Sequence, residues 1–206
     1  MSTRTIAVVS AGLGRPSATR LLADRLAQAT TDALAERGVT AEVVTYELRS
    51  LAHEITDAML AGFPSGELRT ALETVARAAG VIAVTPIFTT SASGLFKSFV
   101  DVVDKDALRG TPVLIGATGG TPRHSLATEY AIRPLFTYLH ADTVTTAVFA
   151  ATDDWAGEAD DVNPLPERIR RAGVELAEKV VARPERSGAA DGFDATPDFA
   201  SLLDRL

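Results

Sequence analysis

The sequence of 206 residues contains no cysteine. The chain therefore has no disulfide, no thiolate nucleophile and no cysteine-ligated metal, so a redox reaction would need a bound cofactor. No apolar run approaches the roughly 20 residues of a membrane-spanning helix, and Ile6 to Val9 is too short for the core of a signal peptide. We expect a soluble protein of the reducing cytoplasm.

Basic residues are in the minority, with 20 Lys and Arg against 27 Asp and Glu and a formal net charge of −7. This balance opposes binding to a nucleic-acid backbone, because each phosphate would meet an unfavourable overall field. A single phosphate is not excluded. Salt screens exposed charges beyond roughly 8 Å, whereas a charge-assisted hydrogen bond contributes about 1.5 to 3 kcal/mol. The composition favours a small-molecule ligand over nucleic acid or a membrane.

Several familiar site signatures are missing. The sequence has no Gly-x-Gly-x-x-Gly fingerprint, no nucleoside-triphosphate loop ending in Gly-Lys-Ser/Thr and no Gly-x-Ser-x-Gly elbow. The acidic pairs at 153–154 and 160–161 lack the spacing of a metal loop and are interpreted as solvated loops. His53 and His140 are interpreted as surface residues, and His124 as a hydrogen bonder at a loop or helix start. We assign no catalytic side chain and no metal site.

What the chain does contain is a regular alternation of strand-like and helix-like segments. This is the pattern of an α/β fold with a parallel sheet between two helical layers. Three strand segments are almost wholly apolar, as buried strands must be, and two are more polar, as edge strands are. Placing the polar pair outermost gives a doubly wound, flavodoxin-like three-layer sandwich with strand order 2-1-3-4-5. The five expected strands are Ile6–Val9, Ala41–Tyr46, Val81–Val84, Val113–Ala117 and Val144–Phe149.

Helices are expected between these strands, each with an apolar stripe toward the sheet. The first carries its stripe over residues 22–33 and ends at Gly38, which suits a left-handed cap. Another follows Gly94. A late helix begins near Pro164 and ends near Pro184.

One domain is expected over residues 1–183, long enough to bury roughly 70% of its unfolded surface. Residues 184–206 form a tail rich in Gly, Ala, Pro and Asp, with a short apolar end from Phe199 to Leu203. Two interpretations of the tail stay open: a poorly ordered segment, or an arm that contacts a neighbouring subunit.

The first strand runs into a loop of small residues that opens a helix. Loop NH groups around Gly12 and the positive end of the helix would converge on one concavity, which is how proteins hold a phosphate. Ser10, Ser17 and Thr19 add hydroxyl donors, and Arg15 adds a permanent charge. Because the loop matches neither nucleotide signature, a flavin monophosphate fits it better.

Two further loops are expected beside the first, because ligands of this fold bind at the carboxyl ends of the strands where the strand order reverses. After the third strand, Pro86 fixes the backbone and leaves the NH groups of Ile87 and Phe88 to reach the edge of a flavin ring. After the fourth strand, a turn with paired glycines allows the backbone to approach a ligand closely. Its NH groups would face the pyrimidine, where a reduced flavin gains negative charge. The turn consists of Thr118, Gly119, Gly120 and Thr121.

At these three loops the chain resembles the NAD(P)H-dependent FMN reductases, especially those that serve two-component monooxygenases such as alkanesulfonate monooxygenase. The resemblance covers roughly residues 5–150 and combines the loops with Gly94, Lys97, Asp101 and His124. It implies a flavodoxin-like fold with FMN held by the first loop through its phosphate. The implied phosphate contacts are Ser10, Arg15, Ser17 and Thr19, and the implied ring contacts are Pro86, Ile87, Phe88 and the Gly119-Gly120 turn.

The chain also departs from that family pattern. Members often carry Tyr where Phe88 stands, so a contact through that hydroxyl is lost. The first loop reads Ser-Ala-Gly-Leu-Gly-Arg, which changes the setting of Arg15. Pro134 removes an NH and should bend the chain around Tyr130 to Phe136, where relatives place a tetramer contact, sometimes with a widened helical turn.

The resemblance implies an enzyme that passes a hydride from the nicotinamide C4 of NADPH to N5 of FMN, with no acid or base supplied by the protein. Arg15 and Arg123 are candidates for the 2′-phosphate of NADPH. A flavin-dependent monooxygenase would receive the reduced FMN, and a homodimer or homotetramer is expected. Two alternatives remain: a quinone or azo-dye reductase with bound FMN, and a non-enzymatic electron carrier.

Overall fold

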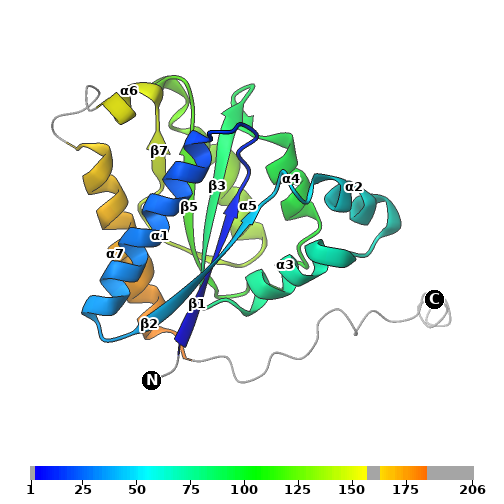
Figure 1. The fold of residues 1–206 in the computed structure, drawn as a ribbon, viewed down its shortest axis with the longest axis horizontal. Coiled ribbons are helices and arrows are strands. Elements are labelled where there is room, and N and C mark those ends of the chain that lie inside the picture. Colours follow the sequence, from blue (N-terminus) through cyan, green and yellow to red (C-terminus); the bar gives the residue numbers. More distant parts are fainter. Residues whose placement is uncertain (1–2, 157–162, 185–206) are drawn as a thin grey trace.

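A twisted sheet forms the middle layer of the molecule, which the computed structural model describes over residues 3–156 and 163–184 (Figure 1). Its strands are β1 (Thr3–Ser10), β2 (Thr40–Glu47), β3 (Gly80–Phe88), β4 (Ser91–Ala92), β5 (Pro112–Thr118), β6 (Asp142–Thr143) and β7 (Val148–Ala150). They hydrogen-bond in the order β2-β1-β3-β5-β6, while β7 pairs with the carboxyl end of β5. The flavodoxin-like order is confirmed, with its fifth position divided between two short strands.

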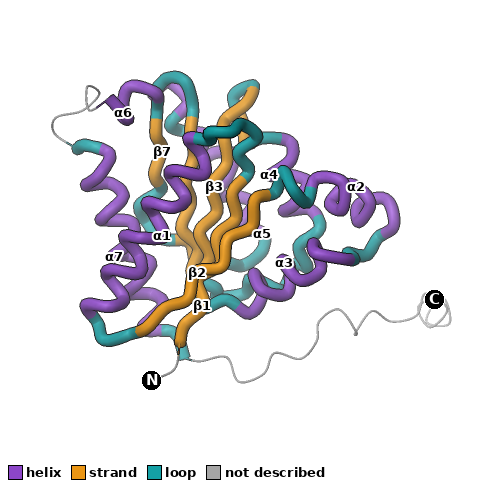
Figure 2. The backbone as a smooth tube through the Cα atoms, viewed as in Figure 1, coloured by secondary structure: helices purple, strands orange, loops and turns teal. Residues whose placement is uncertain are grey.

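Two layers of helices cover the sheet, and Figure 2 shows the strands between them. Along β1, Ile6 and Val8 pack in one apolar core, and Ala7 and Val9 pack in the other, because successive side chains of a strand point to opposite faces. The first core is covered by α1 (Ala18–Glu36) and α7 (Leu165–Ala182). The second is covered by α2 (Ala52–Ala61), α3 (Gly66–Arg77), α4 (Gly94–Asp101) and α5 (Arg133–Tyr138).

The expected helices are present with their apolar stripes inward. In α1, Leu22, Leu26 and Ala33 are buried, and Gly38 follows the helix with a φ of +71°. In α4 the buried side chains are Phe96, Phe99 and Val100, and in α7 they include Ile169, Leu176 and Val180. The Lys97–Asp101 ion pair, 2.7 Å between Nζ and Oδ1, is exposed.

The single fifth strand predicted over Val144–Phe149 is wrong, because the structure breaks it between β6 and β7. The Val144 NH still donates to the Val113 carbonyl of β5 at 2.9 Å, but side chains bond the backbone groups that follow. Arg133 Nη1 donates to the Val144 carbonyl at 2.8 Å, and its Nη2 donates to the Thr145 carbonyl at 3.1 Å. The Thr146 NH donates to the Glu175 carboxylate at 2.8 Å. Period-two hydrophobicity could not reveal these distant partners.

The bend expected at Pro134 takes the form of a π-helix over Thr128–Ile132, directly before α5. The Arg133 NH donates to the Thr128 carbonyl, five residues earlier, which is the wider π spacing. Pro134 lies in the first turn of α5 and has no NH to give to the carbonyl four residues before it. The ring therefore favours a widened turn at this point.

Within the two described ranges, no helix is long and apolar enough to cross a membrane. Residues 185–206, which make up all but the first position of the expected tail, lie outside those ranges, and so do Asp160 and Asp161. The boundary drawn at residue 183 stays a prediction.

Candidate functional site

The carboxyl ends of β1, β3 and β5 bring the three predicted loops to one edge of the sheet. The register pairs Ser10 with Val84 and Pro86 with Thr118. Val8 and Val84 belong to the core under α1 and α7, so the alternation of strand side chains puts Ser10 and Pro86 on that same face. The edge therefore lies beside the amino terminus of α1.

The first loop is packed against that helix terminus. A Cβ on Gly12 would lie 2.0 Å from Ser17 Oγ and 3.1 Å from Thr19 Cβ, so only glycine fits. Ser17 is the N-cap of α1, and its Oγ accepts a hydrogen bond from the Arg20 NH at 3.2 Å. The first NH groups of the helix have no partner within it and carry its positive dipole end. The result is an anion-binding geometry.

Three hydroxyls lie buried beside this helix terminus. Ser10 is 1% exposed, and its Oγ has no hydrogen-bond partner anywhere in the described part of the chain. Thr19 Oγ1 and Thr118 Oγ1 are 2.8 Å apart and join the first loop to the third. Only one of those two hydroxyl hydrogens is used in the pair, so the other is free to donate. Leaving a buried hydroxyl unsatisfied costs about 1 to 3 kcal/mol, which an acceptor on a ligand would offset.

Positive charge near this loop comes from arginines with different surroundings. Arg20 is engaged by Asp24 at 2.7 Å and by Glu47 at 2.9 Å, and its hydrogen bond to Asp24 raises the pKa of the guanidinium. Arg15 is exposed. Arg49 Nη1 donates to the Gly14 carbonyl at 3.4 Å. Arg15 and Arg49 are therefore the loop's candidate cations.

Sequence reasoning missed Arg49. It lies just beyond β2, the strand that pairs with β1 along its whole length, so the carboxyl end of β2 adjoins the first loop. The predicted strand order already places the second strand beside the first. Arg49 could therefore have been inferred to lie near the first loop from that order.

The second loop is a hairpin whose base is stabilised by two buried hydroxyls, those of Thr85 and Ser93. Thr85 Oγ1 accepts a hydrogen bond from the Ser93 NH at 3.1 Å, and Ser93 Oγ caps α4. The Ser93 NH also donates to the Pro86 carbonyl at 3.1 Å. Since antiparallel pairs alternate, Ile87 opposite Ala92 is a non-hydrogen-bonded position, and its NH points away from β4 and toward β5, which pairs with β3 up to Pro86 and Thr118.

The tip of this hairpin is strained and open. Thr89 and Thr90 have φ values of 49° and 68°, which non-glycine residues rarely adopt. Phe88, just before them, keeps 48% of its surface exposed at the edge of the site. The hairpin offers an apolar ring beside the donors of the first loop.

The third loop is the glycine turn after β5. The Gly119 NH donates to the Ala150 carbonyl at 3.1 Å, and a Cβ on Gly119 would lie 2.8 Å from the Phe149 ring. Gly120 has no atom within 4 Å of its would-be Cβ, so its backbone faces open space. Thr121 and Arg123 are exposed. Gly119 is therefore needed for packing against Phe149, whereas Gly120 leaves the turn accessible to a ligand.

Other expectations for polar residues have mixed outcomes. His53 and His140 are exposed, as predicted. His124 is exposed too and ends a short 3₁₀ turn over Pro122–His124, and its role as a hydrogen bonder stays a prediction. The interpretation of Asp154 as a solvated loop residue is wrong. Its side chain is only 8% exposed, because the carboxylate pairs with Arg168.

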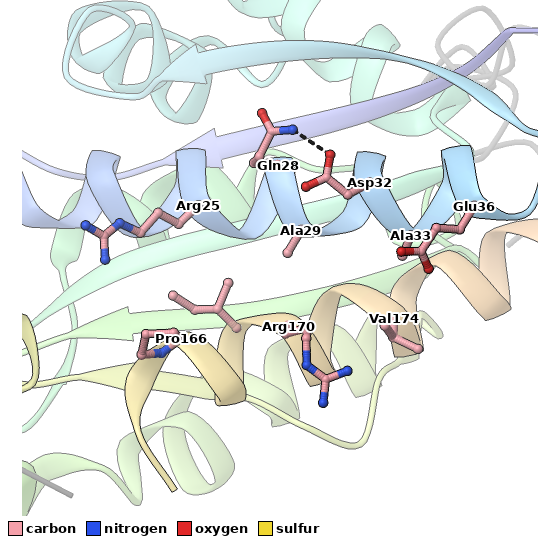
Figure 3. A pocket seen from close by; sticks show the side chains of 10 residues that line it. Arg25, Gln28, Ala29, Asp32, Ala33, Glu36, Pro166, Arg170 and Val174 are labelled. Atoms are coloured by element: carbon pink, nitrogen blue, oxygen red, sulfur yellow. Dashed lines mark hydrogen bonds between the residues drawn. The ribbon is translucent and has the colours of Figure 1, made fainter. Parts of the chain in front are cut away.

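A separate groove of about 450 Å³ runs between α1 and α7 (Figure 3). Ala29, Ala33 and Val174 contribute apolar surface, and charged side chains of both signs surround it, among them Arg25 and Glu36. None of the residues of the three loops lines it. Its mixed charges do not favour an ion of one sign.

The chemistry available at the three loops is therefore hydrogen-bond donation. The loops supply backbone NH groups, hydroxyls and arginine, and no carboxylate, which is the donor set for an anionic ligand. In the part of the chain that the structure describes, no group of three or more His, Cys, Asp and Glu side chains is arranged to hold a metal ion.

Comparison with known proteins agrees with this geometry. The profile of the family described as NADPH-dependent FMN reductase matches residues 4–156. A protein of Pseudomonas aeruginosa named FMN reductase (NADPH) is 32% identical over 174 residues, which cover 84% of this chain and 90% of that protein. The NADH-dependent FMN reductase SfnF of Pseudomonas fluorescens is also 32% identical, over 84% of this chain and 89% of its own length.

Solved structures show the same relationship. An oxidoreductase from Corynebacterium diphtheriae is 41% identical with a TM-score of 0.83, covering 88% of this chain and 99% of the other. The NADH:FMN oxidoreductase EmoB in its apo form is 24% identical with a TM-score of 0.71, covering 89% and 91%, and supports the fold alone. Because the family profile covers well over half of the chain and two relatives exceed 30% identity, this chain belongs to the NADPH-dependent FMN reductase family.

Proposed function

We propose that this enzyme is an NAD(P)H:FMN oxidoreductase that binds FMN across the three loops. The observation that carries the proposal is the buried, unpartnered hydroxyl of Ser10 beside the amino terminus of α1. A ligand phosphate would accept from that hydroxyl and from the free NH groups of the helix at the same time. When bound, FMN supplies the two-electron acceptor for NAD(P)H.

The phosphate end of FMN is assigned to the first loop. Gly12 keeps the backbone close to Ser17, and Thr19 lies buried against Thr118, so the donors of α1 are held before a ligand arrives. Such preorganisation avoids the cost of ordering donors during binding. Arg15 adds charge at the exposed side of the loop.

The ring end is assigned to the second and third loops. Pro86, Ile87 and Phe88 contribute one wall, and the turn from Thr118 through Thr121 contributes the other. The exposed backbone of Gly120 is the donor best placed to stabilise negative charge on the reduced ring, since the NH of Ile87 faces β5. No residue of these loops needs to move a proton, and their work is to orient the ring and exclude water.

The test is a turnover assay with purified protein. NADPH is mixed with excess FMN, and the loss of nicotinamide absorbance is followed, then NADH replaces NADPH and a quinone replaces FMN. We expect FMN to be reduced faster than the quinone. Faster quinone turnover would identify a quinone reductase. Tight flavin binding with negligible turnover would identify an electron carrier and refute the proposal.

The dinucleotide preference is open to the same assay, because one relative is named for NADPH and another for NADH. We propose that either Arg15 or Arg123, both exposed, contacts the 2′-phosphate of NADPH. Arg123→Ala should then lower the NADPH to NADH ratio of kcat/KM. An unchanged ratio would reject its role.

We further propose that reduced FMN passes to a flavin-dependent monooxygenase and that the enzyme is a homodimer or homotetramer. The support for assembly is a run of exposed apolar side chains around the π-helix. Leu126 is 63% exposed, Tyr130 78% and Tyr138 73%. Light scattering of the purified protein measures the assembly mass, and a monomer would contradict the proposal.

A further inference from the structure

Arg168 of α7 connects three points of the chain: β7 itself, the short helix that follows it, and the residues just before α7. Its Nη1 donates to the Phe149 carbonyl, its Nη2 pairs with Asp154 Oδ1, and its Nε donates to the Asn163 carbonyl at 3.0 Å. The Arg168 side chain is 18% exposed and that of Asp154 is 8% exposed. One guanidinium thus links β7 and the segment after it to α7. Figure 1 shows where β7, α6 and α7 lie.

Asp154, the acidic partner of Arg168, also bonds the backbone just after β7. The residue lies in the short helix α6 (Thr152–Ala156), and its Oδ2 accepts a hydrogen bond from the Ala151 NH at 2.8 Å. The carboxylate therefore links α6 both to the residue that follows β7 and to Arg168. Charge-assisted bonds of this kind are about twice as strong as neutral ones.

β7, which Arg168 holds at the Phe149 carbonyl, supports the glycine turn. The Ala150 carbonyl accepts from the Gly119 NH, and the Phe149 ring packs where a Gly119 side chain would be. Thr118 is also paired with Ala150 across the β5–β7 ladder. A shift of β7 at Phe149 and Ala150 would therefore be transmitted directly to Gly119.

We propose that Arg168 and Asp154 are positioning residues that set the Gly119-Gly120 turn for the flavin ring, an inference that rests on the function proposed above. Neither residue lies in the three loops. Removing one partner leaves a poorly exposed charge without compensation, and the segment after β7 must move to hydrate it. The turn then loses its alignment. The first loop contacts the third through the Thr19–Thr118 hydroxyl pair, but its N-cap at Ser17 is held by α1, so the phosphate donors keep their alignment.

Two flavins separate the two ends of the site. FMN carries the phosphate, and riboflavin has the same ring without it. Arg168→Met should weaken both flavins to a similar degree, by about tenfold. Ser17→Ala, in the first loop, should weaken FMN and leave riboflavin within about twofold. Flavin fluorescence quenching gives both dissociation constants.

The matched control is Arg170→Met, two residues further along the same helix. The Arg170 side chain is 66% exposed and pairs with the exposed Glu167 at 2.9 Å, so its loss should change neither affinity. Arg168→Lys keeps the charge but lacks the planar fork that reaches three acceptors, and it should recover only part of the affinity. Arg168→Met combined with Asp154→Asn removes both charges and should cost less than the sum of the single changes.

A loss of folding stability must be separated from a loss of positioning. Gly173→Ala, whose Cβ would lie 2.8 Å from the Ala29 backbone, destabilises the same helix without touching β7. We expect it to lower Tm and leave both flavin affinities unchanged at a temperature where the protein is folded. In steady state, Arg168→Met should raise KM for FMN more than it lowers kcat.

The outcomes are distinct. Wild-type protein that binds neither flavin would refute the proposed function. Wild-type protein that binds both, with Arg168→Met equal to it, would overturn the positioning role alone. The role is also overturned if Arg168→Met weakens only FMN, or if Gly173→Ala weakens the flavins as much at an equal loss of Tm.

Discussion

At the scale of single residues, the site depends on a few positions where the space is already filled. Gly12 is the sharpest example, because its would-be Cβ overlaps Ser17 Oγ at 2.0 Å and approaches Thr19 Cβ at 3.1 Å. Its backbone φ is not in the left-handed region, so packing alone demands glycine there. A small residue in a loop is visible in a sequence, but the atom that it makes room for is not.

Gly12→Ala should raise the dissociation constant of FMN by about tenfold or more, because the added methyl displaces the N-cap of α1. Fluorescence titration with FMN measures it. If the clash with Ser17 is the cause, Gly12→Ala should cost little further affinity in a Ser17→Gly background. An equal cost in both backgrounds would contradict this explanation.

At the scale of elements, helix packing and helix shape depend on contacts between distant residues. Gly173 lies in the middle of α7, where an exposed Gly→Ala change would gain about 1 kcal/mol of helix propensity. Here the methyl would meet Ala29 C and Cβ at 2.8 Å and Thr30 N at 2.9 Å. Backbone cannot rotate away as a side chain can, so the steric term exceeds the propensity gain.

Gly173→Ala should therefore reduce the free energy of unfolding by about 1 to 3 kcal/mol, as overpacking does. Urea denaturation measures the change. Val181→Ala on the exposed side of the same helix serves as the control and should stay within about 0.5 kcal/mol of the wild type. A stabilised Gly173→Ala variant would show that α1 and α7 separate freely.

An ion pair between Glu129 of the π-helix and Arg133, the residue after it, makes stability depend on pH. The hydrogen bond from Arg133 lowers the pKa of Glu129, although partial burial opposes the shift. A lowered pKa in the folded protein adds stability above the unfolded pKa of 4.5, and that stability is lost as the pH falls through the folded value. The Glu129 side chain is 43% exposed, so the contribution is below about 1 kcal/mol.

Glu129→Gln should therefore unfold more easily than the wild type above about pH 5, and the difference should shrink as the pH falls toward 3. Denaturation at a series of pH values measures it, with 0.5 M salt reducing the difference at neutral pH. A difference that stays constant with pH would mean that the ion pair is not its source.

At the scale of the whole molecule, the three loops meet because the strand order aligns the carboxyl ends of β1, β3 and β5. All the residues assigned to FMN lie between Ser10 and Thr121, within the first described range. Removing residues 185–206 should consequently leave the affinity for FMN within about twofold and leave Tm nearly unchanged. Weaker FMN binding in the shortened protein would show that the tail contributes to the site.

The same truncation tests the second interpretation of the tail. Light scattering of the full and shortened chains compares their assembly masses. A smaller assembly after truncation would support an arm between subunits, and an equal mass would reject it.

The alternation of apolar segments was enough to predict the sheet order, the helices with their buried stripes, and the gathering of three loops at one edge, because these follow from periodicity and from the chirality of parallel strands. Local chemistry also indicated an anion site after β1. In contrast, the side-chain bonds at the break between β6 and β7 and the link from Arg168 to Asp154 join residues that are far apart along the chain. Such contacts exist only once the layers have packed. The sequence alone therefore determined which fold forms and which loops are exposed at its edge, and the tertiary structure decided which side chains hold those loops in place.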